Sequence, residues 1–313
     1  MNLQEILQLN TGASWETIER IIRNAPRRYK VYQIPKRNNR GFRTIAHPAR
    51  ELKILQRIVL TEILDPLPVS EIAMAYVHGR GILKNAEQHK NSRWILKLDF
   101  QNFFHSIVPN DWDRAVKRTP DLEKLRTSAD DFHRLLFWGN GTPHPVCLSI
   151  GAPTSPSVSN LVCSKLDEWL LEEATEKGLI VPRYADDITV SGPSVPQLRK
   201  FEKRLATRLE QNRGIKLRLN EDKRGLYGPG ERRMVTGLVI TPDGEISIGR
   251  DRKREIHSLV YSFKNKETSI EEKLKIKGLI AFVNSVEPGF YRSLNAKYGA
   301  KTIREIKHFD PEE

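Results

Sequence analysis

Three aspartates, Asp99, Asp186 and Asp187, are the residues whose type and spacing could do chemistry. Asp99 ends an apolar run, and the other two directly follow Tyr184 and Ala185. Two adjacent like charges are costly unless they share a cation. Mg²⁺ binds few carboxylates and completes its octahedron with phosphate oxygens and water, and two such ions roughly 3.5–4 Å apart activate a hydroxyl and neutralise phosphate charge. The pattern therefore indicates a two-metal phosphoryl-transfer site, although the acid pair alone would also suit an exposed turn.

Short strands and amphipathic helices are the elements that must position these acids. Apolar runs predict a strand at residues 94–99 and a hairpin at residues 179–190 with the acid pair at its turn. Helical spacing, with Ser155 as cap and Pro156 in the first turn, predicts a helix from residue 155 to about residue 178. Further helices are expected at 1–25, 50–64, 85–89 and 198–209, further strands at 30–34, 42–46, 216–219, 235–240 and 245–248, irregular or helical structure at 110–147, and helices from 250 to 308. The expected fold class is α+β.

The charge of the chain favours a polyanionic partner. Its 313 residues include 52 basic and 39 acidic ones, for a net charge of +13, and residues 20–57 contain 12 Lys or Arg and one acid, Glu51. Such clusters suit nucleic acid, and they equally suit a solvated surface. The sequence has no apolar run long enough for a membrane span, no secretory signal after Met1, and only Cys147 and Cys163, too few for a disulfide framework. We expect a cytoplasmic protein without a membrane partner.

Three ordered motifs make the chain resemble the reverse transcriptases. They lie at residues 95–99 with Phe103 and Phe104, at residues 151–156, and at residues 184–187, in the order of that family's palm. The resemblance implies a right-hand polymerase with fingers, a palm of antiparallel sheet backed by helices, and a helical thumb. The expected segments are an N-terminal helix and fingers (1–93), the first palm motif (94–108), an insertion between fingers and palm (109–148), palm and primer grip (149–249), and thumb (250–313).

The resemblance implies roles for individual residues. Asp99, Asp186 and Asp187 are the expected catalytic residues and, with the backbone carbonyl of Phe100, the ligands of two Mg²⁺ ions, for which Mn²⁺ is a possible substitute. Phe104 falls where the family places an aromatic ring that collides with a 2′-hydroxyl, so dNTPs are the expected substrates. The residues expected to bind the nucleotide are Lys36, Arg43, Phe104, Gly151, Ala152 and Lys223.

The basic hairpin resembles the fingers hairpin in which a Lys and an Arg grip the triphosphate. Arg43 follows an aromatic residue on the return strand and is the better match. Lys36 is one candidate for the Lys, with Arg37 and Arg40 close by. Lys223 falls where relatives place a Lys that protonates the leaving pyrophosphate.

One position departs from the family pattern. Ile150 stands where relatives have Gln, directly before Gly151 and Ala152. Glycine at this point lets the backbone approach the nucleotide, but Ile cannot donate or accept the hydrogen bonds of Gln. We therefore expect fidelity and nucleotide affinity to differ from those of relatives, while the metal chemistry need not.

Two short signatures favour the retron reverse transcriptases within the family. They comprise Asn85, Ala86 and His89 of an Asn-Ala-x-x-His motif, and Val235, Thr236 and Gly237 of a Val-Thr-Gly motif, which are expected to bind RNA or to mark the family. The resemblance then implies a structured non-coding RNA, its cDNA product, dNTPs, host RNase H and a separate effector protein as partners. It also implies priming from a guanosine 2′-hydroxyl, a branched RNA–DNA product (msDNA) and a part in anti-phage defence.

Two alternatives stay open at the level of the sequence. Another bacterial reverse transcriptase, of the intron or diversity-generating type, would share the palm motifs, and a non-catalytic RNA-binding protein could share the fold. Phe104 argues against an enzyme that uses ribonucleotides. The intact Asp99, Asp186 and Asp187 argue against a catalytically silent protein.

Overall fold

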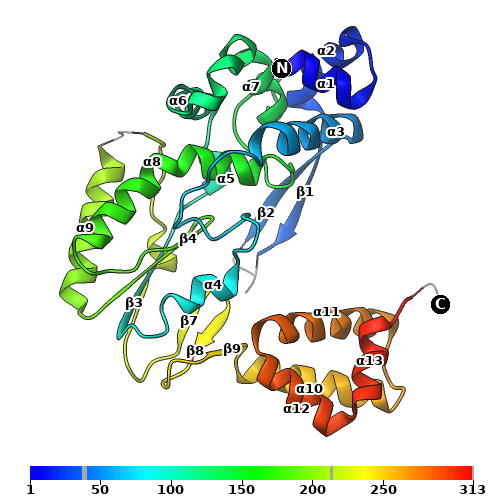
Figure 1. Ribbon diagram of the computed structural model, residues 1–313, viewed down its shortest axis with the longest axis vertical. Helices are drawn as coiled ribbons and strands as arrows, with labels where there is room; N and C mark the ends of the chain where they lie inside the picture. Colours follow the sequence, from blue (N-terminus) through cyan, green and yellow to red (C-terminus); the bar gives the residue numbers. More distant parts are fainter. Residues whose placement is uncertain (37–40, 212–213, 312–313) are drawn as a thin grey trace. The chain divides into compact units, whose positions relative to one another are not determined.

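A computed structural model describes residues 1–36, 41–211 and 214–311, and it divides into two compact units (Figure 1). The first unit comprises Met1–Gly79 and Leu96–Gly225, and the second comprises Arg80–Ile95 and Leu226–Glu313. The finer division into fingers, palm and thumb segments stays a prediction. Among the described residues, no helix combines the length and the apolar character needed to cross a membrane.

Two helices open the first unit, within the helical segment predicted over residues 1–25. Helix α1 (Leu3–Thr11) ends at Gly12, whose φ of 67° lies in the left-handed region that terminates helices. Helix α2 (Trp15–Asn24) begins after Ser14, whose hydroxyl accepts a hydrogen bond from a backbone N–H of the first turn. The helical structure predicted over residues 1–25 and the cap at Ser14 are confirmed, and Gly12 divides the segment into two helices.

A predicted hairpin follows the short 3₁₀ segment η1 (Ala25–Arg27) and is confirmed. Strands β1 (Tyr29–Pro35) and β2 (Phe42–Pro48) pair antiparallel, with Ile34 opposite Arg43. Most of β1 is exposed, whereas the far half of β2 buries its apolar side chains. The hairpin therefore has an anchored base and an exposed outer part.

Helices make up most of the first unit after the hairpin. Helix α3 (Arg50–Val59) continues into a π-helical turn, η3 (Leu60–Leu64). The helical structure predicted at residues 50–64 is therefore confirmed. The short helix α5 (Phe103–Ser106) precedes the region 110–147 that was expected to be irregular or helical. That region contains α6 (Pro109–Arg118), the 3₁₀ segment η4 (Pro120–Ser128) and α7 (Ala129–Leu136). Cys147 and Cys163 are buried free thiols.

A four-stranded sheet carries the three aspartates. Its order is β4 (Arg183–Tyr184), β5 (Asp187–Gly192), β3 (Trp94–Asp99) and β6 (Gly225–Tyr227), with β4 and β5 antiparallel. The strand predicted at residues 94–99 and the hairpin with the acid pair at its turn are confirmed. The strand predicted at residues 216–219 is wrong, because that segment makes a single bridge, from Leu219 to Phe100.

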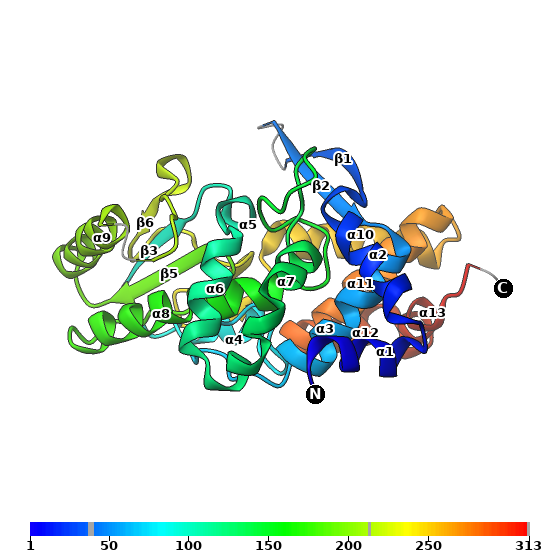
Figure 2. The same cartoon turned by 90° about the horizontal axis from the view of Figure 1, so that it is seen from above.

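Two long helices lie beside the sheet (Figure 2). Helix α8 (Ser155–Thr175) buries most of its residues and exposes Lys165, Glu168 and Glu172 on one side, and α9 (Val195–Glu210) packs on both α8 and β5. Thr154 rather than Ser155 occupies the N-cap position of α8, without a capping hydrogen bond from its side chain, and the helix ends a little earlier than expected. After α9, the chain returns to the sheet through the 3₁₀ segment η5 (Glu221–Lys223).

The second unit combines small strands with a helical bundle. Its elements are α4 (Ile82–Glu87), the sheet β7 (Arg233–Val235), β8 (Leu238–Ile240) and β9 (Ile246–Ser247), and the helices α10 (Arg250–Lys264), α11 (Ile270–Val286), α12 (Pro288–Tyr298) and α13 (Ala300–His308). One apolar cluster joins them, with members such as Val235, Ile256, Ile280 and Ile303. The helical structure predicted after residue 250 is confirmed.

The strand predicted at residues 235–240 is instead a tight hairpin. Thr236 and Gly237 adopt φ values of 46° and 84°, which reverse the chain between β7 and β8. Apolar residues on both sides of the turn made the segment read as one strand. Glycine accommodates a positive φ without steric cost, and this explains the residue type at the turn.

Candidate active site

A two-residue turn presents the acid pair. Tyr184 pairs with Asp187 across the β4–β5 hairpin, which leaves Ala185 and Asp186 as the turn itself. Ala185 is left-handed, with a φ of 57°. This conformation costs a residue with a Cβ atom roughly 1–2 kcal/mol, so surrounding contacts must hold it.

The buried Arg183 provides such a contact. Its Nη1 donates to the Ala185 carbonyl oxygen at 3.1 Å, and its Nε and Nη2 donate to the two carboxylate oxygens of Asp167 at 2.6 and 2.7 Å. Nη2 also donates to Asn160 Oδ1 at 3.2 Å. The side chains of Arg183 and Asp167 are both 0% exposed. No motif marked this network, although a charged residue next to Tyr184 in an apolar strand was a signal, because buried charges are paired.

Strand β3 brings Asp99 to the same turn. Phe100 N donates to the Asp186 carbonyl oxygen at 3.0 Å, and Asn220 N donates to the Asp99 carbonyl oxygen at 2.8 Å. The Asp99 carboxylate pairs with Lys223, whose Nζ lies 2.8 and 2.7 Å from its two oxygens. The structure thus brings together three residues that were predicted from distant parts of the sequence.

Burial and mutual repulsion make the acid pair hard to ionise. Burial raises the pKa of Asp186, and the negative charge of Asp99 raises it further. Burial likewise raises the pKa of Asp187 to about 6, helped by its two acidic neighbours and opposed by Lys97, whose Nζ is 4.0 Å from Asp187 Oδ2. The three carboxylates therefore act on one another as members of one site, which a bound cation would stabilise.

The carboxylates suit Mg²⁺ as an open set of ligands. Asp187 Oδ1 is buried and has no hydrogen-bond partner. Within the described residues, no group of three or more His, Cys, Asp or Glu side chains is arranged so that it could hold a metal ion by itself. Mg²⁺ is usually held by one or two carboxylates together with substrate phosphates, so oxygen donors spread around a turn fit an ion that binds with its substrate. The backbone carbonyl of Phe100 stays a predicted ligand.

Tyr76 lies near Phe104, Asp186 and Arg43. The Phe104 ring lies 5.3 Å from that of Phe103 and 6.4 Å from that of Tyr76, measured between centroids. Burial, and then the charge of Asp186, raise the pKa of Tyr76, whereas Arg43 lowers it. Arg43 and Asp186 are therefore both within electrostatic reach of the Tyr76 hydroxyl. No sequence motif marked Tyr76, which sits in an irregular segment with a φ of 62°.

The loop before α8 lies against the β1–β2 hairpin. Ala46 N donates to the Ile150 carbonyl oxygen at 3.0 Å. A Cβ atom at Gly151, whose φ is 128°, would lie 2.9 Å from the Ala46 carbonyl oxygen, so glycine permits this close approach. Ala152 is buried beside it. Contact of this loop with a nucleotide stays a prediction.

The assignment of a triphosphate-binding Lys also stays a prediction. Lys36 directly follows β1, and its backbone N–H donates to the Gly41 carbonyl oxygen at 2.8 Å. Its neighbours Arg37 and Arg40 lie outside the described residues.

The two retron signatures meet inside the second unit. Asn85 Nδ2 donates to Thr236 Oγ1 at 3.4 Å, and Thr236 Oγ1 donates to the Ile82 carbonyl oxygen at 3.3 Å. These bonds tie α4 to the turn between β7 and β8, at which Gly237 supplies a positive φ.

Most of the signature side chains are buried. Asn85, Ala86, His89 and Val235 are each no more than 1% exposed. Burial lowers the pKa of His89 to about 3, so its ring is neutral. This burial favours a structural role for these four residues over direct contact with RNA.

Comparisons with known proteins place the chain in a family. The family model for reverse transcriptase (RNA-dependent DNA polymerase) matches residues 34–244. The chain is 36% identical over 286 residues to the Retron Ec83 reverse transcriptase of Escherichia coli, covering 90% of each protein. It is 32% identical over 316 residues to the Retron Ec86 reverse transcriptase of Escherichia coli, covering 98% of this chain and 94% of that protein.

Two solved telomerase structures have a fold similar to that of this chain. The apo telomerase from Candida tropicalis matches with a TM-score of 0.52 at 12% identity, over 89% of this chain and 60% of that chain. A telomerase from Candida albicans, solved with a fragment of telomeric RNA, matches with a TM-score of 0.51 at 12% identity, over 90% of this chain and 61% of that chain. This chain spans less than two thirds of both, and the likeness confirms the right-hand polymerase fold. The chain belongs to the reverse transcriptase family, within the group of retron reverse transcriptases.

Proposed function

We propose that this RNA-directed DNA polymerase copies a cognate structured non-coding RNA into DNA by a two-metal mechanism. The observation that carries the proposal is the meeting of Asp99, Asp186 and Asp187 at one turn in a chain that is similar to retron reverse transcriptases over most of its length. An intron-type or diversity-generating enzyme would use the same acids, so the choice of a retron substrate rests on the relatives.

The three aspartates would hold two Mg²⁺ ions, or Mn²⁺ as a substitute. When bound, such ions lower the pKa of the attacking hydroxyl and neutralise the triphosphate. The contribution of the protein is a fixed turn with concentrated negative charge, held by Arg183 on one side and by the end of β3 on the other. Lys223 forms an ion pair with Asp99. In this proposal it would supply a proton to the leaving pyrophosphate.

Phe104 would select the sugar of the incoming nucleotide. Replacing it with Ala removes the ring that would collide with a 2′-hydroxyl, so we expect the preference for dNTP over NTP to fall by about 100-fold, equal to about 2.7 kcal/mol. The measurement is kcat/KM for dTTP and UTP on one RNA template. Phe104→Tyr keeps the ring and should keep the preference, whereas unchanged selectivity in the Ala variant would remove Phe104 from this role.

Arg43 would bind the triphosphate. Loss of a charged contact to phosphate typically costs 2–5 kcal/mol, so Arg43→Ala should raise the apparent KM for dNTP by about 30-fold or more, with a far smaller effect on RNA binding. Lys30→Ala removes an exposed cation from the same hairpin and serves as control. The opposite pattern, weaker RNA binding at unchanged KM, would make Arg43 a template contact.

The proposal also covers the priming group, the product and the partner proteins of the enzyme, which are those of a retron. DNA synthesis would begin from a guanosine 2′-hydroxyl within the RNA and would leave a branched RNA–DNA molecule, msDNA. Host RNase H would remove the copied template, and a separate effector protein would join the RNA–DNA in anti-phage defence. The similarity to the Ec83 and Ec86 retron enzymes supports this setting.

The nucleic acid that co-purifies with the chain tests this setting. Sequencing it after separate RNase and DNase digestion should reveal DNA joined covalently to RNA through a 2′-linked branch. Protein with Asp186→Asn, expressed in the same way, should carry the RNA without the DNA. Plain RNA on the wild-type protein would count against the retron reaction and would favour a non-catalytic RNA-binding protein.

A further inference from the structure

Tyr76 combines an exposed aromatic side chain with a strained backbone. The residue is 51% exposed, and its φ of 62° lies in the left-handed region. A bulky residue rarely adopts this conformation, because its Cβ atom then crowds the backbone, and such strain is found mainly at functional sites where neighbouring contacts enforce it. The roles proposed for the acids, for Arg43 and for Phe104 leave this conformation of Tyr76 unexplained.

The chain directly before Tyr76 is firmly anchored. The buried segment of residues 72–75 forms two backbone hydrogen bonds with Arg183 of β4, of 2.7 and 2.8 Å. Asn160 Nδ2 of α8 donates to the Ala75 carbonyl oxygen at 3.0 Å. Burial ends at Tyr76. The position of Tyr76 is therefore set by α8 and by β4, the strand that leads into the acid turn.

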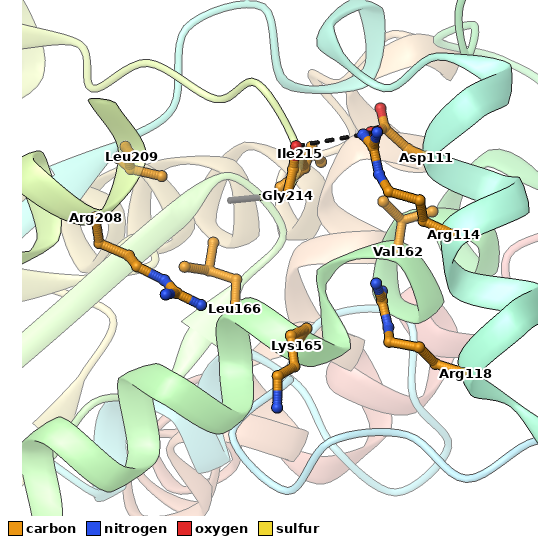
Figure 3. Close-up of a pocket in the computed structure, with 10 residues that line it drawn as sticks. All are labelled: Asp111, Arg114, Arg118, Val162, Lys165, Leu166, Arg208, Leu209, Gly214 and Ile215. Carbon is orange, nitrogen blue, oxygen red and sulfur yellow. Dashed lines mark hydrogen bonds and ion pairs between the residues drawn. The ribbon is translucent and has the colours of Figure 1, made fainter. Parts of the chain in front are cut away.

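Helix α8, which carries Asn160, is a close-packed support for this segment. It packs against α6 and α9, and the hollow between the three helices has a cavity volume of about 40 Å³ (Figure 3), which is room for water but not for a nucleotide. Val162 and Leu166 in this hollow are only 5% and 7% exposed. Asn160 Oδ1 also accepts a hydrogen bond from Arg183 Nη2 at 3.2 Å. The network that holds the Ala185 turn therefore also holds the segment before Tyr76.

The Tyr76 ring contacts the ring of Phe104. Their centroids are 6.4 Å apart, with an angle of 53° between the ring planes, within the usual range for interacting aromatic pairs. On its other contact Phe104 meets Phe103 at 5.3 Å, and Phe103 stacks on Phe100 at 6.1 Å. These three phenylalanines belong to one short segment, residues 100–104. Tyr76 comes from a different, anchored segment, so its ring fixes the half-buried Phe104 relative to the acid turn.

Tyr76 also lies close to the groups expected to bind the triphosphate. Arg43 and Asp186 are both within electrostatic reach of its hydroxyl. One residue thus adjoins the ring expected to select the sugar, an acid expected to bind metal and a cation expected to bind phosphate. This position suits a residue that shapes the site of the incoming nucleotide.

We propose that Tyr76 is a positioning residue for sugar selection, whose ring holds the Phe104 ring against the sugar of the incoming nucleotide. The inference rests on the proposed function, because it takes Phe104 as the residue that excludes a 2′-hydroxyl. Without the Tyr76 ring, Phe104 can turn into the space left open and admit a ribonucleotide. The left-handed backbone is then explained, because it directs the Tyr76 side chain to Phe104.

The ratio of kcat/KM for dTTP to kcat/KM for UTP, measured on one RNA template, provides the test. Tyr76→Ala should lower this preference for dTTP by about 10-fold, because the ring of Phe104 stays but is no longer held in place. Tyr76→Phe keeps the ring and should keep the preference within about 2-fold. Tyr261→Ala removes an exposed tyrosine of the second unit and is the matched control. Wild-type preference in Tyr76→Ala would overturn the proposal.

A double-mutant cycle tests whether Tyr76 acts through Phe104. Tyr76→Ala combined with Phe104→Ala should lower the preference no further than Phe104→Ala alone, within about 2-fold, because there is then no ring left to position. Losses that multiply in the double variant would show that Tyr76 acts on the nucleotide by itself, and this would overturn a positioning role.

Tyr76→Gly keeps the proposal testable if the Ala variant does not fold. Glycine adopts a positive φ without steric cost, so this change removes the ring and releases the backbone strain together. The Gly variant should melt at or above the temperature of the wild type and should show the same loss of preference as Tyr76→Ala. A folded Gly variant with the wild-type preference would overturn the proposal.

Nucleotide binding separates this inference from the proposed function. Displacement of a dTTP labelled on its γ-phosphate, by dTTP and by UTP, gives the ratio of the two Kd values on a primer that ends in a dideoxynucleotide, without DNA synthesis. This ratio should favour dTTP on the wild type and fall by about 10-fold in Tyr76→Ala. Wild-type protein with this binding pattern that makes no DNA on an ordinary primer would refute the polymerase function and still support Tyr76. Normal DNA synthesis with an unchanged ratio in Tyr76→Ala would refute the role of Tyr76 alone.

Discussion

Protein with Asp186→Asn should make DNA on an RNA template at least about 10³-fold more slowly than wild type, equal to about 4 kcal/mol of lost transition-state stabilisation. Asn keeps the size of the side chain but loses the charge that would bind Mg²⁺. The turn itself should persist, because the backbone carbonyl of residue 186 accepts its bond from Phe100 N whatever the side chain is.

The same substitution should leave the melting temperature unchanged or higher at neutral pH. Burial and Asp99 raise the pKa of Asp186 above its unfolded value. A carboxyl with a raised pKa binds its proton more tightly in the folded protein, so its ionisation at neutral pH lowers the free energy of unfolding. A neutral Asn removes this penalty. Activity and stability should therefore change in different directions, as is common at catalytic sites.

A thermal melt and a primer-extension assay on the same preparation check this prediction. Asp251→Asn is a suitable control, because Asp251 is an exposed acid of the second unit whose ion pair with Arg232 is also exposed. It should retain both the melting temperature and the activity. Near-normal synthesis by Asp186→Asn, or a lower melting temperature that explains its inactivity, would contradict a metal-binding role.

Arg183→Leu should destabilise the first unit by about 3–5 kcal/mol, because it leaves the Asp167 carboxylate buried without its partner. Arg23→Leu breaks an exposed ion pair with Glu19 and should cost less than about 0.5 kcal/mol. The measurement is the free energy of unfolding in urea. Equal effects at the two positions would show that the buried network contributes no more than a surface pair.

A double variant separates the two roles of Arg183. Arg183→Leu with Asp167→Leu removes both buried charges, and replacing a buried ion pair by apolar residues is often neutral for stability. Most of the lost stability should therefore return. DNA synthesis should not, because nothing then donates to the Ala185 carbonyl oxygen to hold the left-handed turn. Recovery of activity together with stability would show that Arg183 acts on stability alone.

The local pattern of the sequence predicts the elements that carry the acids because each has a local cause. Strand β3 is an apolar run closed by Asp99, and α8 follows a Ser-Pro start with continuous helical spacing. The hairpin β1–β2 shows β-prone residues on both sides of a basic segment. Such signals lie within a few residues and need no tertiary partner.

Other features depend on contacts between distant residues. Arg183 and Asp167 are 16 positions apart, and their pairing is visible only once β4 lies beside α8. Lys223 was predicted as a nucleotide contact, but its ion pair with Asp99, 124 positions away, could not be foreseen. Tyr76 has no motif at all, and only the fold places it near Asp186. Tertiary packing decides such neighbours, and local propensity carries no information about them.

The measurement that tests the central claim most directly is incorporation of labelled dTMP by the purified chain on a poly(rA) template with an oligo(dT) primer. With Mg²⁺, wild-type protein should extend the primer along the RNA, and the chelator EDTA should stop it. Asp99→Asn, which removes a carboxylate contributed by β3, should give no more product than EDTA. Absence of synthesis by the wild type, or synthesis that persists in Asp99→Asn, would contradict a metal-dependent reverse transcriptase centred on these three acids.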